Sequence, residues 1–118
     1  MSEVNRELTD HERRLVRWML EHGIPEAAGF LAQLELAEVT PWKCGCGCAS
    51  INFQIRGRPK APPGVHLLAD FLFGDDRNLS GIFVYEKDGI LSGLEVYGLS
   101  CAAPKSLPEP EELRPLAT

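Results

Sequence analysis

The dipeptide Asp88-Gly89 constrains the fold of this chain more than any other local feature. Two apolar runs, residues 82–87 and 90–97, lie on either side of it. Both residues of the dipeptide tolerate positive φ angles, which the tight turns between antiparallel strands require. The pattern therefore predicts a β-hairpin, and with it an antiparallel sheet.

Two further segments favour strands of the same sheet. Residues 49–56 alternate between apolar side chains at odd positions and polar ones at even positions, which predicts a strand whose odd positions face the core. The proline-rich residues 56–64 form a connection, because proline is excluded from central strands. Residues 65–73 are an apolar run that fits a buried strand, although its periodicity also allows a helix.

The N-terminal residues predict a helical hairpin. Thr9 and Glu12 have the spacing of a capping box at the start of a first helix. Gly23 suits a left-handed cap at its end, and Pro25 suits the first turn of a second helix. The side chains expected on the buried faces are Leu15, Val16, Met19 and Leu20 in the first helix and Ala27, Phe30, Leu31 and Leu34 in the second.

These segments together predict one α+β domain over residues 1–118, in which an N-terminal helical hairpin packs on a mainly antiparallel β-sheet. The hairpin is expected to take residues 1–36 and the sheet residues 37–97. Residues 98–118 include four prolines and are expected to follow the surface as an irregular tail.

The chain is acidic, and its charge is unevenly distributed. It carries 12 Lys and Arg against 17 Asp and Glu, a net charge of −5, which argues against binding to nucleic acid or to an anionic membrane. The N-terminus lacks the apolar core of a signal peptide, and no apolar run approaches the ~20 residues of a membrane span. We therefore expect a cytoplasmic protein. Residues 40–66, by contrast, hold four basic side chains and no acidic one.

Three cysteines in this basic segment, Cys44, Cys46 and Cys48, carry the richest chemistry of the sequence. On an extended strand the outer two would lie about 13 Å apart. A single zinc ion needs thiolate sulfurs roughly 3.8 Å apart. A turn would bring the sulfurs together, and Gly45 and Gly47 allow one, because glycine reaches backbone angles closed to other residues.

Two interpretations of the cysteines follow from this geometry. If the alternation of residues 49–56 continues back to Cys44, the thiols are spread along a strand and bind nothing as a set, and this interpretation is favoured. If the segment turns, the three cysteines bind one soft divalent ion, zinc first, with Cys101 as the preferred fourth ligand and His66 as the other candidate. Structural disulfides are not expected in a cytosolic protein.

Three motifs of this chain occur together: residues 8–23, the block CGCGCASI at residues 44–51, and residues 88–95. In these motifs the chain resembles a family of small uncharacterised bacterial proteins. The resemblance implies a bacterial, cytoplasmic, single-domain protein and adds no catalytic residue.

The sequence brings together no acid, base and nucleophile of a catalytic site, so we lean against an enzyme. The preferred function is a protein-binding module of the inhibitor or immunity type, steered by its acidity onto a basic partner protein. The alternative is a zinc-binding domain or thiol-dependent enzyme built on Cys44, Cys46 and Cys48. A cleft lined by these cysteines, with a strongly shifted pKa beside it, would favour the alternative. A broad apolar patch elsewhere would favour the protein-binding module.

Overall fold

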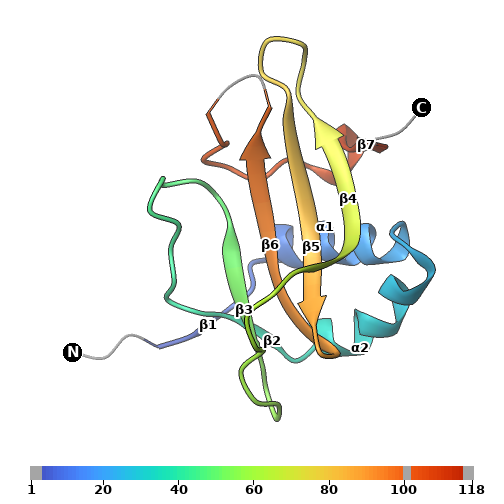
Figure 1. Cartoon of the computed structure of the whole chain (residues 1–118), viewed down its shortest axis with the longest axis vertical. Helices are drawn as coiled ribbons and strands as arrows, with labels where there is room; N and C mark the ends of the chain where they lie inside the picture. Colours follow the sequence, from blue (N-terminus) through green and yellow to red (C-terminus); the bar gives the residue numbers. More distant parts are fainter. Residues whose placement is uncertain (1–3, 100–101, 116–118) are drawn as a thin grey trace.

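The structure, a computed structural model, describes residues 4–99 and 102–115 and has an α+β architecture (Figure 1). Its strands are β1 (Arg6–Glu7), β2 (Ala37–Val39), β3 (Ile51–Ile55), β4 (His66–Phe73), β5 (Ser80–Lys87), β6 (Ile90–Gly98) and β7 (Arg114–Pro115). Its helices are α1 (Asp10–Glu21), the 3₁₀ helix η1 (Pro25–Phe30), α2 (Leu31–Leu34) and the 3₁₀ helix η2 (Pro110–Glu112). Within the described residues the strands form one sheet in the order β1-β2-β3-β6-β5-β4-β7.

The sheet is antiparallel at each of its pairings, and the predicted hairpin lies at its centre. Asp88 and Gly89 have φ angles of 54° and 80° and connect β5 to β6, which confirms the predicted turn. The ambiguous run of residues 65–73 is a strand, β4. It pairs with β5 on one side and with β7 on the other, so its backbone groups are satisfied only in an extended conformation.

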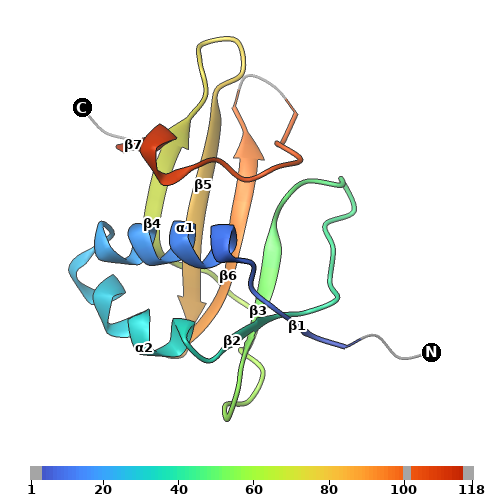
Figure 2. The same cartoon turned by 180° about the vertical axis from the view of Figure 1, so that it is seen from behind.

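Helix α1 crosses one face of the sheet and contacts β4 and β5 (Figure 2). Its predicted capping box is confirmed, because Glu12 N–H donates to Thr9 Oγ1 (3.1 Å) and Thr9 N–H donates to Glu12 Oε1 (2.9 Å). Its buried apolar side chains are those expected: Leu15, Val16, Met19 and Leu20.

The second arm of the expected helical hairpin is regular only in part. Pro25 occupies the predicted first turn, but the segment begins as the six-residue 3₁₀ helix η1 and ends in the single α-helical turn α2. Of its expected core residues, Ala27 and Leu34 are buried, whereas Phe30 and Leu31 are half-buried. No helix in the described part of the chain has the length and apolar character needed to cross a membrane.

The predicted left-handed cap at Gly23 is wrong. The cap residue is His22, with a φ angle of −118°, and Gly23 does not have a positive φ angle. Gly23 is needed for a different reason, since a Cβ atom there would lie 2.1 Å from Leu68 O. The neighbouring Ile24 N–H donates to the same carbonyl (2.9 Å), so the end of α1 touches the backbone of β4 directly.

The C-terminal segment is more regular than the expected irregular tail. It contains η2, which has its own capping box between Glu109 and Glu112, and β7, which pairs with the edge strand β4. His11 Nε2 lies 2.9 Å from Pro108 O, and Pro108 and Pro110 are buried. The segment therefore covers the end of α1, and prolines are compatible with it because they occupy a helix start and a sheet edge.

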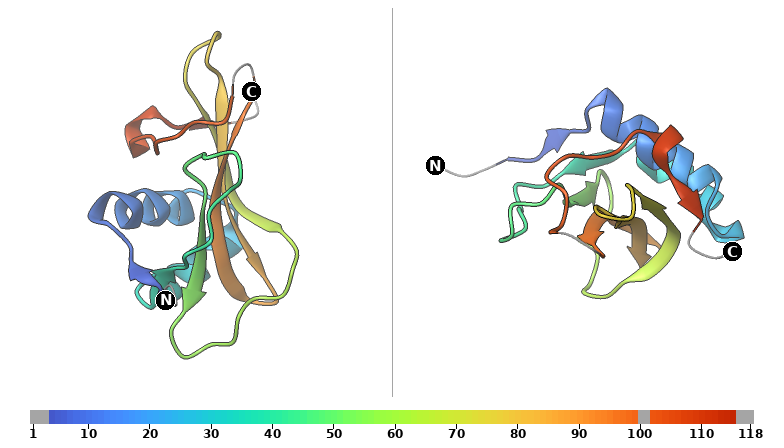
Figure 3. Two further views of the ribbon diagram at one scale, coloured as in Figure 1. Left: turned by 90° about the vertical axis from the view of Figure 1, so that its left-hand side faces the viewer. Right: turned by 90° about the horizontal axis from the view of Figure 1, so that it is seen from above.

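The two faces of the sheet have different surroundings. Helix α1 and the C-terminal segment lie on one face and enclose the core, and the connection of residues 56–65 crosses the other (Figures 1 and 3). The outer face carries a cluster of rings, in which Phe83 lies 5.7 Å from Tyr85 and 5.9 Å from Tyr97 between ring centroids. Tyr97 Oη also donates to Asp70 Oδ1 (3.4 Å).

Candidate metal centre

The cysteine segment is a turn and not a strand. Gly47 N–H donates to Cys44 O (3.0 Å), and Gly47 has a φ angle of +81°, in the left-handed region that favours glycine. Strand β3 begins only at Ile51. The favoured interpretation, in which the alternation of residues 49–56 continues back to Cys44, is therefore wrong. The reversal at Gly47 is its physical reason.

The turn gathers the three thiols. The sulfurs of Cys44, Cys46 and Cys48 all lie within 4.8 Å of one another, and those of Cys44 and Cys46 are 2.8 Å apart. These separations bracket the roughly 3.8 Å that a tetrahedral zinc thiolate needs. Cys46 is exposed and the other two are half-buried, so rotation about the Cα–Cβ bonds can adjust the separations.

Hydrogen bonds already orient two of the sulfurs. Cys48 N–H donates to Cys46 Sγ (3.3 Å), and Cys48 Sγ lies 3.2 Å from Ser50 Oγ. Ser50 is buried, and its hydroxyl accepts from Val96 N–H (3.0 Å) on β6. This second layer of contacts resembles the outer shell that holds metal ligands in place.

The same contacts separate the acidities of two thiols. Partial burial of Cys48 raises its pKa, but hydrogen bonds from the Ser50 hydroxyl and backbone N–H and from the Cys46 and Cys44 thiols outweigh this effect and lower the pKa to about 7. Hydrogen bonds with the Cys44 and Cys48 thiols raise the pKa of Cys46 to about 11. Cys48 is therefore the first of these two thiols to become a thiolate, the form that attacks electrophiles and binds metals.

The two predicted fourth ligands have different outcomes. Cys101 lies outside the described residues. The segment after it, however, is fixed at the turn, because Ala49 N–H donates to Pro104 O (2.9 Å). His66 lies on β4, which two strands separate from β3, and its Nδ1 is 2.6 Å from Glu86 Oε2. The structure does not bring His66 to the cysteines.

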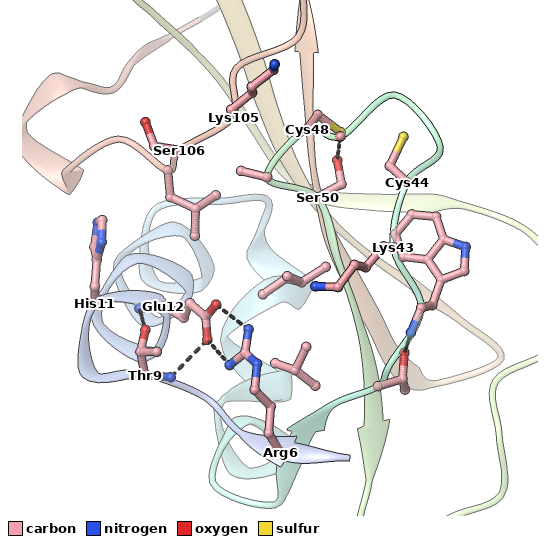
Figure 4. Close-up of a pocket in the computed structure, with 17 residues that line it drawn as sticks. Arg6, Thr9, His11, Glu12, Lys43, Cys44, Cys48, Ser50, Lys105 and Ser106 are labelled. Atoms are coloured by element: carbon pink, nitrogen blue, oxygen red, sulfur yellow. Dashed lines mark hydrogen bonds and ion pairs between the residues drawn. The ribbon is translucent and has the colours of Figure 1, made fainter. Parts of the chain in front are cut away.

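A cleft of about 410 Å³ opens beside the turn, with Cys44 and Cys48 along one side and the start of α1 along the other (Figure 4). An ion pair at its floor joins Arg6 to Glu12 through two hydrogen bonds of 2.9 Å. Burial raises the pKa of Glu12, but hydrogen bonds from Arg6 and from Thr9 outweigh burial and lower it below the usual range.

Two lysines, Lys43 and Lys105, complete the charged lining of the cleft. Sequence reasoning did not connect Lys105 or Arg6 with the cysteines, because these residues lie far apart along the chain. The basic character of residues 40–66, which include Lys43, was the one available signal.

Comparison with models of protein families, with curated proteins and with solved structures finds no match to this chain.

Proposed function

We propose that this chain is a metal-binding domain in which Cys44, Cys46 and Cys48 hold one soft divalent ion, zinc first. The observation that supports the proposal is the gathering of three sulfurs within 4.8 Å of one another on a hydrogen-bonded turn. Thiolates are the preferred ligands of zinc and of other soft ions. The condition set by the sequence, that the segment must turn, is met.

Metal binding also agrees with the thiol acidities. An ion would bind the Cys48 thiolate first and then displace the proton of Cys46, whose pKa is raised to about 11. Because binding releases protons, zinc affinity should rise with pH. A disulfide is a weaker candidate, since two cysteines separated by one residue form only a strained ring.

Elemental analysis of the full chain, purified without added metal or chelator, tests the proposal. We expect close to one zinc per chain in the wild type and background metal in Cys46→Ser. Cys101→Ser, which leaves the turn intact, is the matched control. Circular dichroism of both variants separates loss of metal from loss of fold. Background metal in a stably folded wild-type protein would refute the proposal.

Binding to a protein with a basic surface is a second candidate function. It is favoured by the outer sheet face, where Phe83 and Tyr97 are half-exposed beside the carboxylates of Asp70 and Glu95, in a chain of net charge −5. Opposite charge would steer such a partner onto this face. Affinity capture from the native host, compared between wild type and Phe83→Ser, tests it: a basic partner retained equally by both would contradict a role of this face.

A further inference from the structure

We infer that the cleft beside the cysteine turn binds a small monocarboxylate with an apolar body, which occupies the fourth position of the bound metal. This inference rests on the proposed metal centre and adds the ligand class of the same site. Zinc sites that bind ligands keep one position open, whereas structural sites have four protein ligands.

The position of the cleft supports an open site. Cys44 and Cys48 line it, whereas the exposed Cys46 does not. An ion held by the three sulfurs would thus be reached from the cleft past Cys44 and Cys48. Figure 4 shows these two cysteines on the same side of the cleft as Lys43, whose ammonium group points into it.

The charge of the cleft selects a monovalent anion. Among the described residues Glu12 is the one acidic side chain of the lining, and Arg6 already neutralises it. Within the same part of the chain neither Lys43 nor Lys105 has an ion pair, and in Figure 4 Lys105 lies at the rim with its ammonium directed outward. A divalent ion with three thiolates carries one negative charge. The two lysines leave one positive charge, which a carboxylate balances.

The remaining walls fit an apolar body on that carboxylate. The cleft holds about 410 Å³, within the size range of sites for small molecules. Its apolar lining comes from four separate segments and consists of Val39, Trp42, Ile51 and Leu107. Benzoate is a suitable probe, since it joins one carboxylate to one flat apolar ring. Benzamide has nearly the same shape without the charge.

The test uses the full chain loaded with Co²⁺, which takes the same thiolate ligands as zinc and absorbs visible light. A thiolate-to-cobalt charge-transfer band, lost in Cys46→Ser, reports the metal centre itself. Benzoate titrated into the loaded protein should shift the visible cobalt bands to saturation, and benzamide should not. Lys43→Gln should weaken benzoate binding by about tenfold or more, as expected for loss of a charge-assisted contact. Lys60→Gln, an exposed lysine outside the cleft lining, should leave it unchanged.

The outcomes separate this inference from the metal proposal. Absence of the charge-transfer band would refute the metal centre, and the inference with it. A normal band whose cobalt spectrum ignores benzoate, or responds equally to benzamide or in Lys43→Gln, would overturn the inference alone. A loss of cobalt affinity in Cys101→Ser as large as in Cys46→Ser would also overturn it, because the site would then be a closed set of four cysteines.

Discussion

Replacement of Gly23 by alanine should destabilise the fold through one backbone contact. The added Cβ atom would lie 2.1 Å from Leu68 O and 2.9 Å from Ala69 Cβ. Ordinary contacts between such atoms are about 3.5 Å or longer. The end of α1 must therefore move away from β4, and the hydrogen bond from Ile24 N–H to Leu68 O (2.9 Å) is strained or lost.

The magnitude follows from two costs and one gain. Overpacking costs about 1–3 kcal/mol, and loss of a backbone hydrogen bond costs about 0.5–1.5 kcal/mol. Alanine restricts the unfolded chain relative to glycine, which returns about 0.4–1 kcal/mol. The free energy of unfolding should therefore fall by about 2 kcal/mol, a large share of the 5–15 kcal/mol typical of a domain.

Urea unfolding followed by circular dichroism measures this effect. With a denaturant slope of about 2 kcal/mol/M, the midpoint of Gly23→Ala should fall by about 1 M. Gly29→Ala is the matched control, because a Cβ atom at Gly29 meets no atom within 4 Å and its φ angle is not positive. Its midpoint should stay equal or rise. Equal midpoints for the two variants would refute the argument that Gly23 is kept by its contact with β4.

Two further predictions concern the titrating groups. In metal-free protein, alkylation of Cys48 by iodoacetamide should have its pH midpoint at about 7, and Ser50→Ala should move the midpoint up toward the ordinary value of about 8.5; mass spectrometry of the tryptic peptide of residues 44–56 locates the label, and an unchanged midpoint would argue against the role of Ser50. Glu12→Gln should lower the free energy of unfolding by about 1–2 kcal/mol at neutral pH. Since the folded pKa of Glu12 is lowered, its ionised form stabilises the fold above the unfolded pKa, and the difference from wild type should vanish as pH falls through the folded pKa. Urea unfolding at a series of pH values measures it, and a difference independent of pH would contradict the ion pair with Arg6.

The sequence alone determined those features whose physical cause lies within a few residues. The capping box of Thr9 and Glu12 and the turn at Asp88-Gly89 depend on backbone angles and hydrogen bonds between near neighbours, so both were predictable. The alternation of residues 49–56 likewise predicted the buried side chains of Phe53 and Ile55, because a strand with one covered face needs that pattern.

Features that depend on distant partners were decided by the tertiary structure. Residues 65–73 have an apolar pattern that fits a helix or a strand, and pairing with β5 and β7 selects the strand. The tail acquires β7 because the edge of β4 offers unpaired backbone groups, which no local signal in the tail reveals. Gly23 fits a left-handed cap locally, but its contact with Leu68 determines its role.

The candidate site divides in the same way. The sequence identified the three thiols and the two glycines that permit a turn, but glycine permits an extended chain equally well. The turn itself is selected where Ala49 bonds to Pro104 and Ser50 bonds to Val96, two partners that lie far along the chain. The cleft exists only because the folded chain places Arg6 and Lys105 beside the cysteines, and spacing in a single sequence does not encode such proximity.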